Sequence, residues 1–186
     1  MNGADLQPFL KGEWIELRPL RADDWDALFA AASDPRIWAQ HPNSNRYERD
    51  VFRKFFDEAI ASGGALAAVD QSTRRIIGSS RFVWLDQDRG DLEIGWTFLE
   101  RAYWGGRYNG EMKRLMLQHA FAFAERVLFV IGRNNTRSRR AIERIGAVIL
   151  EDNERERMLA RASLDAVIYE IRKPVAPSQF FDHVST

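Results

Sequence analysis

Residues 93 to 146 constrain the fold of this chain most, because strand-like and helix-like segments alternate there. A strand-like run, EIGWTFL, leads into the loop YWGGRYNGEMK (103–113), after which apolar residues recur at helical spacing. The unbroken apolar run VLFVI (127–131) is typical of a strand buried on both faces. A shorter helix follows it and ends at Gly146. This alternation predicts an α/β domain.

The remaining segments complete the expected fold. A strand at 14–20 precedes a helix capped by Asp23, and a second helix covers 49–62. Three strands follow, at 65–70, 76–85 and 91–99, and two last strands, about 147–158 and 165–172, read as a hairpin. The predicted order is β-α-α-β-β-β-α-β-α-β-β.

Length and composition favour one domain. With 186 residues, 45% of them hydrophobic, the chain closes one sizeable core. We expect this domain to span residues 1–173, and residues 174–186 to form a tail with two prolines. Phe180 and Phe181 of the tail could dock on the domain or on a second subunit, which would make a homodimer.

Charge and cysteine content exclude several kinds of protein. Lys plus Arg and Asp plus Glu number 27 each, so no global field favours nucleic acid or an anionic membrane as a partner. The chain has no cysteine, which excludes disulfides and thiolate metal sites, and no His, Asp or Glu pair has metal-ligand spacing. The start lacks a signal-peptide pattern, and no apolar run reaches the roughly 20 residues of a membrane span. We expect a soluble, cytoplasmic protein.

The glycine loop can be tested against three phosphate-binding motifs. Gly105 and Gly110 have the spacing of a Walker A loop, but Glu111 and Met112 replace the required Lys and Ser/Thr. The dinucleotide pattern G-x-G-x-x-G also fails, because its second glycine falls on Arg107. A coenzyme A loop remains, and a plain strand-to-helix turn is the alternative.

The segment YWGGRYNGE resembles the pyrophosphate loop of the GNAT superfamily of acyl-CoA-dependent N-acyltransferases. The resemblance covers most of residues 13–172 and is to the branch of bacterial ribosomal-protein N-terminal acetyltransferases, which often reads Y-W-G-x-G-Y-A-T-E there. It departs from that branch at Arg107 and Asn109. It implies a single GNAT-like domain with a mixed, mostly antiparallel, twisted central sheet flanked by helices.

A second stretch, NTRSRRAIERIGA (135–147), resembles the N-x-x-S-x-x-x-x-E-K-x-G-F motif of the same superfamily. Asn135, Ser138, Glu143 and Gly146 are in register with it. In the superfamily this asparagine hydrogen-bonds the pantetheine arm, whereas in any protein it is also a good helix N-cap. The arginines of this helix are a solvated face or, at Arg139 or Arg140, a contact to the nucleotide phosphates.

The resemblance implies transfer of an acetyl group from acetyl-CoA to a primary amine, on a small molecule or a protein N-terminus, without an acyl-enzyme. Glu93 is the candidate general base, and a structural pair with Arg81 is its alternative. Many relatives use a tyrosine to protonate the thiolate; the corresponding helix here has none, so Ser138 is the candidate. The alternatives are a degenerate module that binds coenzyme A or nothing, and an acyltransferase with another acyl group or acceptor.

The candidate binding residues fall into two groups. Those expected to contact coenzyme A are Thr97, Leu99, Trp104, Gly105, Gly106, Arg107, Tyr108, Asn109, Gly110, Asn135, Ser138 and Arg139. Those expected to line the acceptor pocket are Trp38, His41, Arg46 and Tyr47, with an ordinary surface loop as the alternative.

Overall fold

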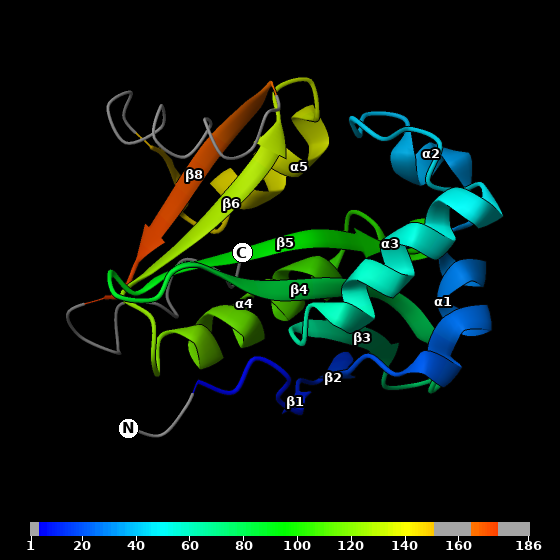
Figure 1. Ribbon diagram of the computed structural model, residues 1–186, viewed down its shortest axis with the longest axis horizontal. Helices are drawn as coiled ribbons and strands as arrows, with labels where there is room; N and C mark the ends of the chain where they lie inside the picture. Colours follow the sequence, from blue (N-terminus) through cyan, green and yellow to red (C-terminus); the bar gives the residue numbers. More distant parts are fainter. Residues whose placement is uncertain (1–3, 151–164, 175–186) are drawn as a thin grey trace.

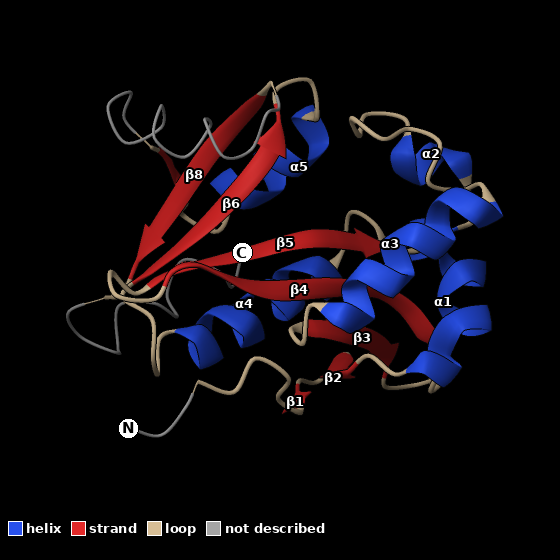
Figure 2. Cartoon of the chain, in the orientation of Figure 1, coloured by secondary structure: helices blue, strands red, loops and turns tan. Residues whose placement is uncertain are grey.

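The computed structural model describes residues 4–150 and 165–174, which form one twisted sheet with helices on both faces (Figures 1 and 2). The sheet order is β1-β2-β3-β4-β5-β6-β8-β7. The strands are β1 (Leu10–Lys11), β2 (Ile15–Pro19), β3 (Ala65–Asp70), β4 (Ile76–Asp86), β5 (Asp91–Leu99), β6 (Arg126–Gly132), β7 (Val148–Ile149) and β8 (Ala166–Arg172). The helices are α1 (Trp25–Ala32), α2 (Pro35–Trp38), α3 (Arg49–Ala61), α4 (Arg107–Ala120) and α5 (Thr136–Glu143).

Two hydrophobic clusters cover the two faces of the sheet. One packs α4 and α5 against the sheet, and the other packs α1, α2 and α3 against the opposite face. In α3, Phe52, Phe55, Phe56 and Ala59 share one buried side, as their spacing predicts. Burying each such phenylalanine contributes about 2 kcal/mol to stability. The sheet is therefore held between two helical layers, which position its central strands.

The pairing of β5 with β6 is the one parallel pairing among the described strands, and it is short. It joins Asp91 to Arg126, Leu92 to Val127 and Glu93 to Leu128, and no further pair. At its base the buried Arg126 holds the carboxylate of Asp91 through Nε and Nη2, at 2.8 and 2.6 Å. Beyond it the two strands diverge as a V (Figure 1). Residues of both strands line a cavity at this divergence.

An irregularity in β5 shapes this opening. Gly95 pairs with Arg81 and Phe98 with Ser79, so β5 carries one residue more than β4 between these pairs. Trp96 adopts a positive φ of 52° there, which is rare for a large side chain. The extra residue exchanges the two faces of the strand. Strict alternation puts Leu99 on the face of Glu93, which is wrong: Leu99 packs in the same cluster as Leu92 and Ile94.

The sequence-based fold is confirmed, with local corrections. The short elements β1 and α2 were not expected, and the predicted order is otherwise found. Asp23 does not cap the first helix; a 3-10 turn (Ala22–Asp24) precedes it, and the carboxylate of Asp24 accepts the Arg21 N–H at 2.9 Å. Pairing of β7 with β8 confirms the hairpin at Val148–Ile149, while the rest of its first strand and the tail lie outside the described residues.

No helix of the described residues is long and apolar enough to cross a membrane.

Candidate active site

A cavity of about 1100 Å³ fills the opening between β5 and β6. Its walls come from six places: β5, the loop and first turns of α4, the end of β6, α5, the segment around α2, and the turn before β2 that carries Glu13 and Trp14. Such a volume at the divergence of two strands accommodates an extended ligand that crosses the sheet. The predicted residues that line it are Trp38, His41, Arg46, Thr97, Leu99, Trp104, Gly105, Gly106, Arg107, Asn109, Gly110, Asn135 and Ser138.

Three predicted residues have side chains directed elsewhere. Tyr108 donates its hydroxyl to Asp70 at 3.3 Å and stacks edge-on against Tyr103. Arg139 donates from Nε to the Tyr169 hydroxyl at 3.0 Å. Tyr47 is exposed and is not part of the cavity wall. These three side chains do not reach the cavity, so a binding role for any of them would require its backbone or a rearrangement.

The N-terminus of α4 is the end of the cavity suited to an anion. Helix α4 begins at Arg107, earlier than the sequence pattern predicts, and its N-cap, Gly106, makes no side-chain cap. The first backbone N–H groups of the helix are thus available to a ligand, and the helix dipole favours a negative charge beside them. A Cβ atom added at Gly105, Gly106 or Gly110 would meet nothing within 4 Å, so the backbone borders open space. Gly105 has a φ of +70°, which favours glycine.

Arg107 turns away from this backbone. Its guanidinium carbon lies 3.3 Å from the centre of the Trp14 ring, and both residues line the rim of the cavity. Glu111, one turn later, accepts the backbone N–H groups of Glu13, Trp14 and Ile15 at 2.7 to 2.9 Å. The arginine therefore does not crowd the loop backbone, and its charge remains near the anion-binding end.

Asn135 begins α5 on the opposite wall. Its side-chain oxygen accepts the Ser138 N–H at 3.2 Å, so it is the N-cap, and the side chain is buried. Because the oxygen is used in the cap, the amide NH2 group remains as a donor. Asn135 and Ser138 both line the cavity. Two arginines of the same helix, Arg137 and Arg140, line it as well.

Glu93 and Lys113 are two buried titratable groups at the cavity, and Lys113 is part of its wall. Burial raises the pKa of Glu93 to about 7, although the charges of Arg81 and Lys113 oppose this shift. Burial likewise lowers the pKa of Lys113 to about 7, against the attraction of Glu93. Glu93 is not in the cavity wall itself; its carboxylate lies against Gly95, which is, and a Cβ at Gly95 would stand 2.6 Å from Oε1.

Lys113 was not identified from the sequence. Its Nζ donates to Thr97 Oγ1 at 2.6 Å, and that hydroxyl also contacts Ser80 Oγ at 2.7 Å. The signal was present in helical spacing, because Leu117 and Ala120 follow Lys113 at i+4 and i+7 and are buried. A lysine on an apolar stripe is costly and usually has a role. The Lys113 ammonium links α4 to the strand that carries Glu93.

The segment around α2 forms another wall of the cavity. His41 Nε2 lies 3.2 Å from Arg46 Nη1, and the His41 ring meets Trp38 edge-on. Burial, with the nearby Arg46 charge, lowers the pKa of His41 to about 4, so this imidazole is neutral at pH 7. A base with that pKa is poorly matched to neutral pH, whereas Glu93 is well matched.

Among the described residues, no group of three or more His, Cys, Asp or Glu side chains could hold a metal ion.

Comparison with known proteins is consistent with this geometry. Residues 15–148 match a family described as acetyltransferase (GNAT) domain. A protein of Bacillus licheniformis called uncharacterized N-acetyltransferase p20 is 25% identical over 115 residues, which cover 59% of this chain and 64% of that protein. This chain thus spans just under two thirds of the length of that relative.

Solved structures share the fold. A GCN5-related N-acetyltransferase from Brucella melitensis superposes with a TM-score of 0.77 at 19% identity, covering 96% of this chain and 82% of that one. A GNAT-family acetyltransferase from Bacillus anthracis gives a TM-score of 0.70 at 18% identity, with coverages of 89% and 99%. At these identities the likeness establishes the fold, and the resemblance to the ribosomal-protein branch stays a prediction.

Proposed function

Since this chain belongs to the family of GNAT acetyltransferases, we propose that it transfers an acetyl group from acetyl-CoA to a primary amine by direct attack of the amine. The observation that carries the proposal is the cavity between the diverging β5 and β6, with an uncapped helix N-terminus on one wall and the buried Glu93 beneath it. One end suits a phosphate and the other suits proton transfer.

The residues of the first end fit coenzyme A. The N–H groups at the start of α4 would hold the pyrophosphate, with Gly105 and Gly106 leaving room for it. Asn135 would donate its amide to the pantetheine arm from the opposite wall. Acetyl-CoA supplies a thioester, whose carbonyl carbon is open to attack by an amine.

Proton transfer is the task of Glu93 in this proposal. An amine arrives largely as an ammonium ion at neutral pH and must lose a proton before it can attack. A carboxylate with a pKa of about 7 accepts that proton efficiently, and a water molecule beside Gly95 would connect it to the cavity. Ser138, on the wall of the cavity, would donate its hydroxyl hydrogen to the departing thiolate.

Two measurements test the proposal. Calorimetry with acetyl-CoA tests binding, and release of free thiol across a panel of amines and N-terminal peptides tests transfer. We expect the logarithm of turnover to rise with pH and level off above about 7, because Glu93 must be deprotonated to act. Glu93→Gln should lower turnover by roughly 100-fold or more and leave acetyl-CoA affinity unchanged.

Different failures have different meanings. Absence of binding at millimolar acetyl-CoA would exclude the proposed function altogether. Binding without thiol release across the panel would leave a coenzyme A binding module instead of an enzyme. Unchanged turnover in Glu93→Gln would make that residue structural.

A further inference from the structure

One side of the Arg81 guanidinium group has no hydrogen-bond partner inside the protein. The residue lies on β4, is 5% exposed, and its Nε and Nη2 atoms are buried without any hydrogen-bond partner. Buried donors of a charged group are costly when unpaired, and few are left so in native proteins. Nε and Nη2 form one side of the planar guanidinium, so their two N–H bonds point the same way.

The same molecule shows what that edge binds. Arg126 uses Nε and Nη2 to hold both oxygens of Asp91, and Arg36 uses the same two atoms to hold Asp34 at 3.0 and 3.2 Å. In each case the partner is a carboxylate in bidentate contact. The unpaired edge of Arg81 is therefore of the kind that carboxylates occupy elsewhere in this protein, and its two nitrogen atoms are enclosed behind the cavity wall.

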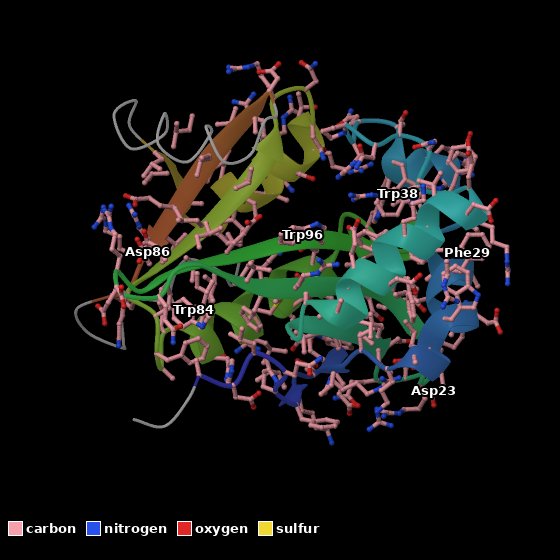
Figure 3. The ribbon with its side chains drawn as sticks, viewed as in Figure 1. Asp23, Phe29, Trp38, Trp84, Asp86 and Trp96 are labelled. Atoms are coloured by element: carbon pink, nitrogen blue, oxygen red, sulfur yellow. The ribbon has the colours of Figure 1, made fainter. Side chains whose placement is uncertain are left out.

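Arg46 lies near the same phenylalanine as Arg81 and, unlike Arg81, lines the cavity. Its guanidinium carbon lies 4.7 Å from the centre of the Phe55 ring, and that of Arg81 lies 5.8 Å from the same ring. Arg46 lines the cavity, as do Gly95, the strand partner of Arg81, and Trp96, whose ring stacks on Arg81 at 4.6 Å. Figure 3 shows Trp96 on β5 and Trp38, which also contacts Arg46, at the end of α2.

The protein's own carboxylates do not fill the edge. Glu58 and Glu93 both attract Arg81, yet no hydrogen bond or ion pair joins either to it in the described part of the chain. Burial, followed by the like charge of Arg81, lowers the pKa of Arg46 to about 10, despite the attraction of Glu58. Arg46 is thus cationic at neutral pH, and no carboxylate of the described residues forms an ion pair with Arg46 or Arg81.

From this geometry we infer that the acceptor amine also carries a carboxylate, which Arg46 binds at the cavity wall while the charge of Arg81 attracts it from behind that wall. The inference rests on the proposed function, because it places the carboxylate beside the amine that Glu93 deprotonates. Glu93 and Arg81 interact electrostatically, so the ammonium and the carboxylate of one small molecule find opposite charges close together. Two acceptors have this chemistry: a free α-amino acid, and a peptide whose N-terminal residues are acidic.

The decisive experiment compares acceptors that differ only in the carboxylate. Thiol release is measured with α-amino acids against their amides, and with peptides that have Asp or Glu at the first two positions against Asn or Gln. We expect kcat/KM to favour the carboxylate by about 10- to 100-fold, in line with a charge-assisted bidentate contact. The pair of substrates that shows the preference identifies the source of the carboxylate.

Variants connect the preference to the arginines. Arg46→Gln should reduce the acid-to-amide ratio to near one, and Arg46→Lys should restore only part of it, because a lysine keeps the charge and loses the fork. Arg81→Gln should act in the same direction if it folds. Arg53→Gln is the matched control, because Arg53 also stacks on an aromatic ring, Trp25 at 4.8 Å, but is exposed on α3 outside the cavity.

A binding measurement tests the inference independently of catalysis. N-acetyl amino acids and their amides are titrated into the protein saturated with coenzyme A, and the tryptophan fluorescence is followed. Tighter binding of the acids, lost in Arg46→Gln, supports the inference even without turnover. Equal turnover or equal binding of acids and amides overturns it, and equal turnover would leave the acetyltransferase proposal intact.

Discussion

Replacing Lys113 with methionine removes a buried ammonium and retains an unbranched side chain of similar length. In the folded protein burial lowers the pKa of Lys113 from 10.5 to about 7. Between these values the unfolded chain holds a proton at Lys113 that the folded protein has released. The free energy of unfolding of the wild type therefore rises with pH through this window, by about 1.4 kcal/mol per pH unit.

The magnitude follows from the width of the window. Lys113 costs nothing above pH 10.5, where it is neutral in both states, and costs about 4 to 5 kcal/mol below pH 7, where it is charged in both. Methionine forfeits the hydrogen bond to Thr97, which is worth about 1 kcal/mol, and Thr97 keeps its contact to Ser80. Lys113→Met should therefore be more stable than the wild type at pH 7, by roughly 2 to 4 kcal/mol.

The titration of Glu93 limits the pH range in which the effect of Lys113 on stability can be measured separately. The pKa of Glu93 in the folded protein, about 7, lies above the unfolded value of 4.5. The stability that Glu93 contributes through this difference is therefore present below pH 4.5 and is lost as the pH rises to 7. Above pH 7.5 Glu93 is mostly ionised in both states and adds little further slope. Urea unfolding at pH 7.5, 8.5 and 9.5 thus isolates Lys113, with Lys54→Met, at an exposed position on α3, as the control.

Plots of the free energy of unfolding against pH that run parallel for wild type and Lys113→Met would refute this reasoning. If the free energies of unfolding of wild type and Lys113→Met differ by a constant amount across the three pH values, Lys113 does not titrate there. A second readout concerns the base. The Lys113 charge lowers the pKa of Glu93, so in Lys113→Met the rising limb of the pH–rate profile should move to higher pH.

Asn135→Ala should lose about 1 kcal/mol of stability with the N-cap, and should bind coenzyme A more weakly. Asn135→Asp should keep the cap and the stability but not the affinity, because it has no amide donor; full affinity in Asn135→Asp, by calorimetry, would contradict the pantetheine contact. Glu111→Ala should lower the free energy of unfolding by roughly 3 kcal/mol, because three backbone N–H groups lose a charged acceptor. A loss below 1 kcal/mol in urea unfolding would show that water replaces that carboxylate.

Much of the site could be predicted from short sequence patterns. Gly105 and Asn135 were singled out because they stand in short motifs that resemble those of the GNAT superfamily, and both line the cavity. The left-handed glycine and the helix N-cap seen at these positions are also properties of a few consecutive residues. Glu93 was singled out because a carboxylate is costly in a central strand with apolar neighbours, and burial does raise its pKa. For Gly105 and Asn135 the physical cause acts within a few residues along the chain, whereas the burial of Glu93 depends on the whole fold.

Other features could not be predicted because they depend on contacts across the fold. The extra residue at Trp96 exchanges the faces of β5, and nothing in the local alternation signals it. Arg107 is directed by Trp14, which is more than ninety positions earlier, and Tyr108 by Asp70. Side-chain direction at these positions is decided by the partner, and the partner is known only after folding.

The sequence by itself thus determined the order of most strands and helices, the Asn135 cap and the glycine loop, since hydrophobic spacing and turn chemistry are local. Only the tertiary structure decided that Lys113 and Glu93 share one buried region and that one edge of Arg81 has no partner. The reason is that burial and charge pairing depend on distances in space between segments far apart in the chain. These distances set the pKa of the base and the chemistry of the acceptor that we propose.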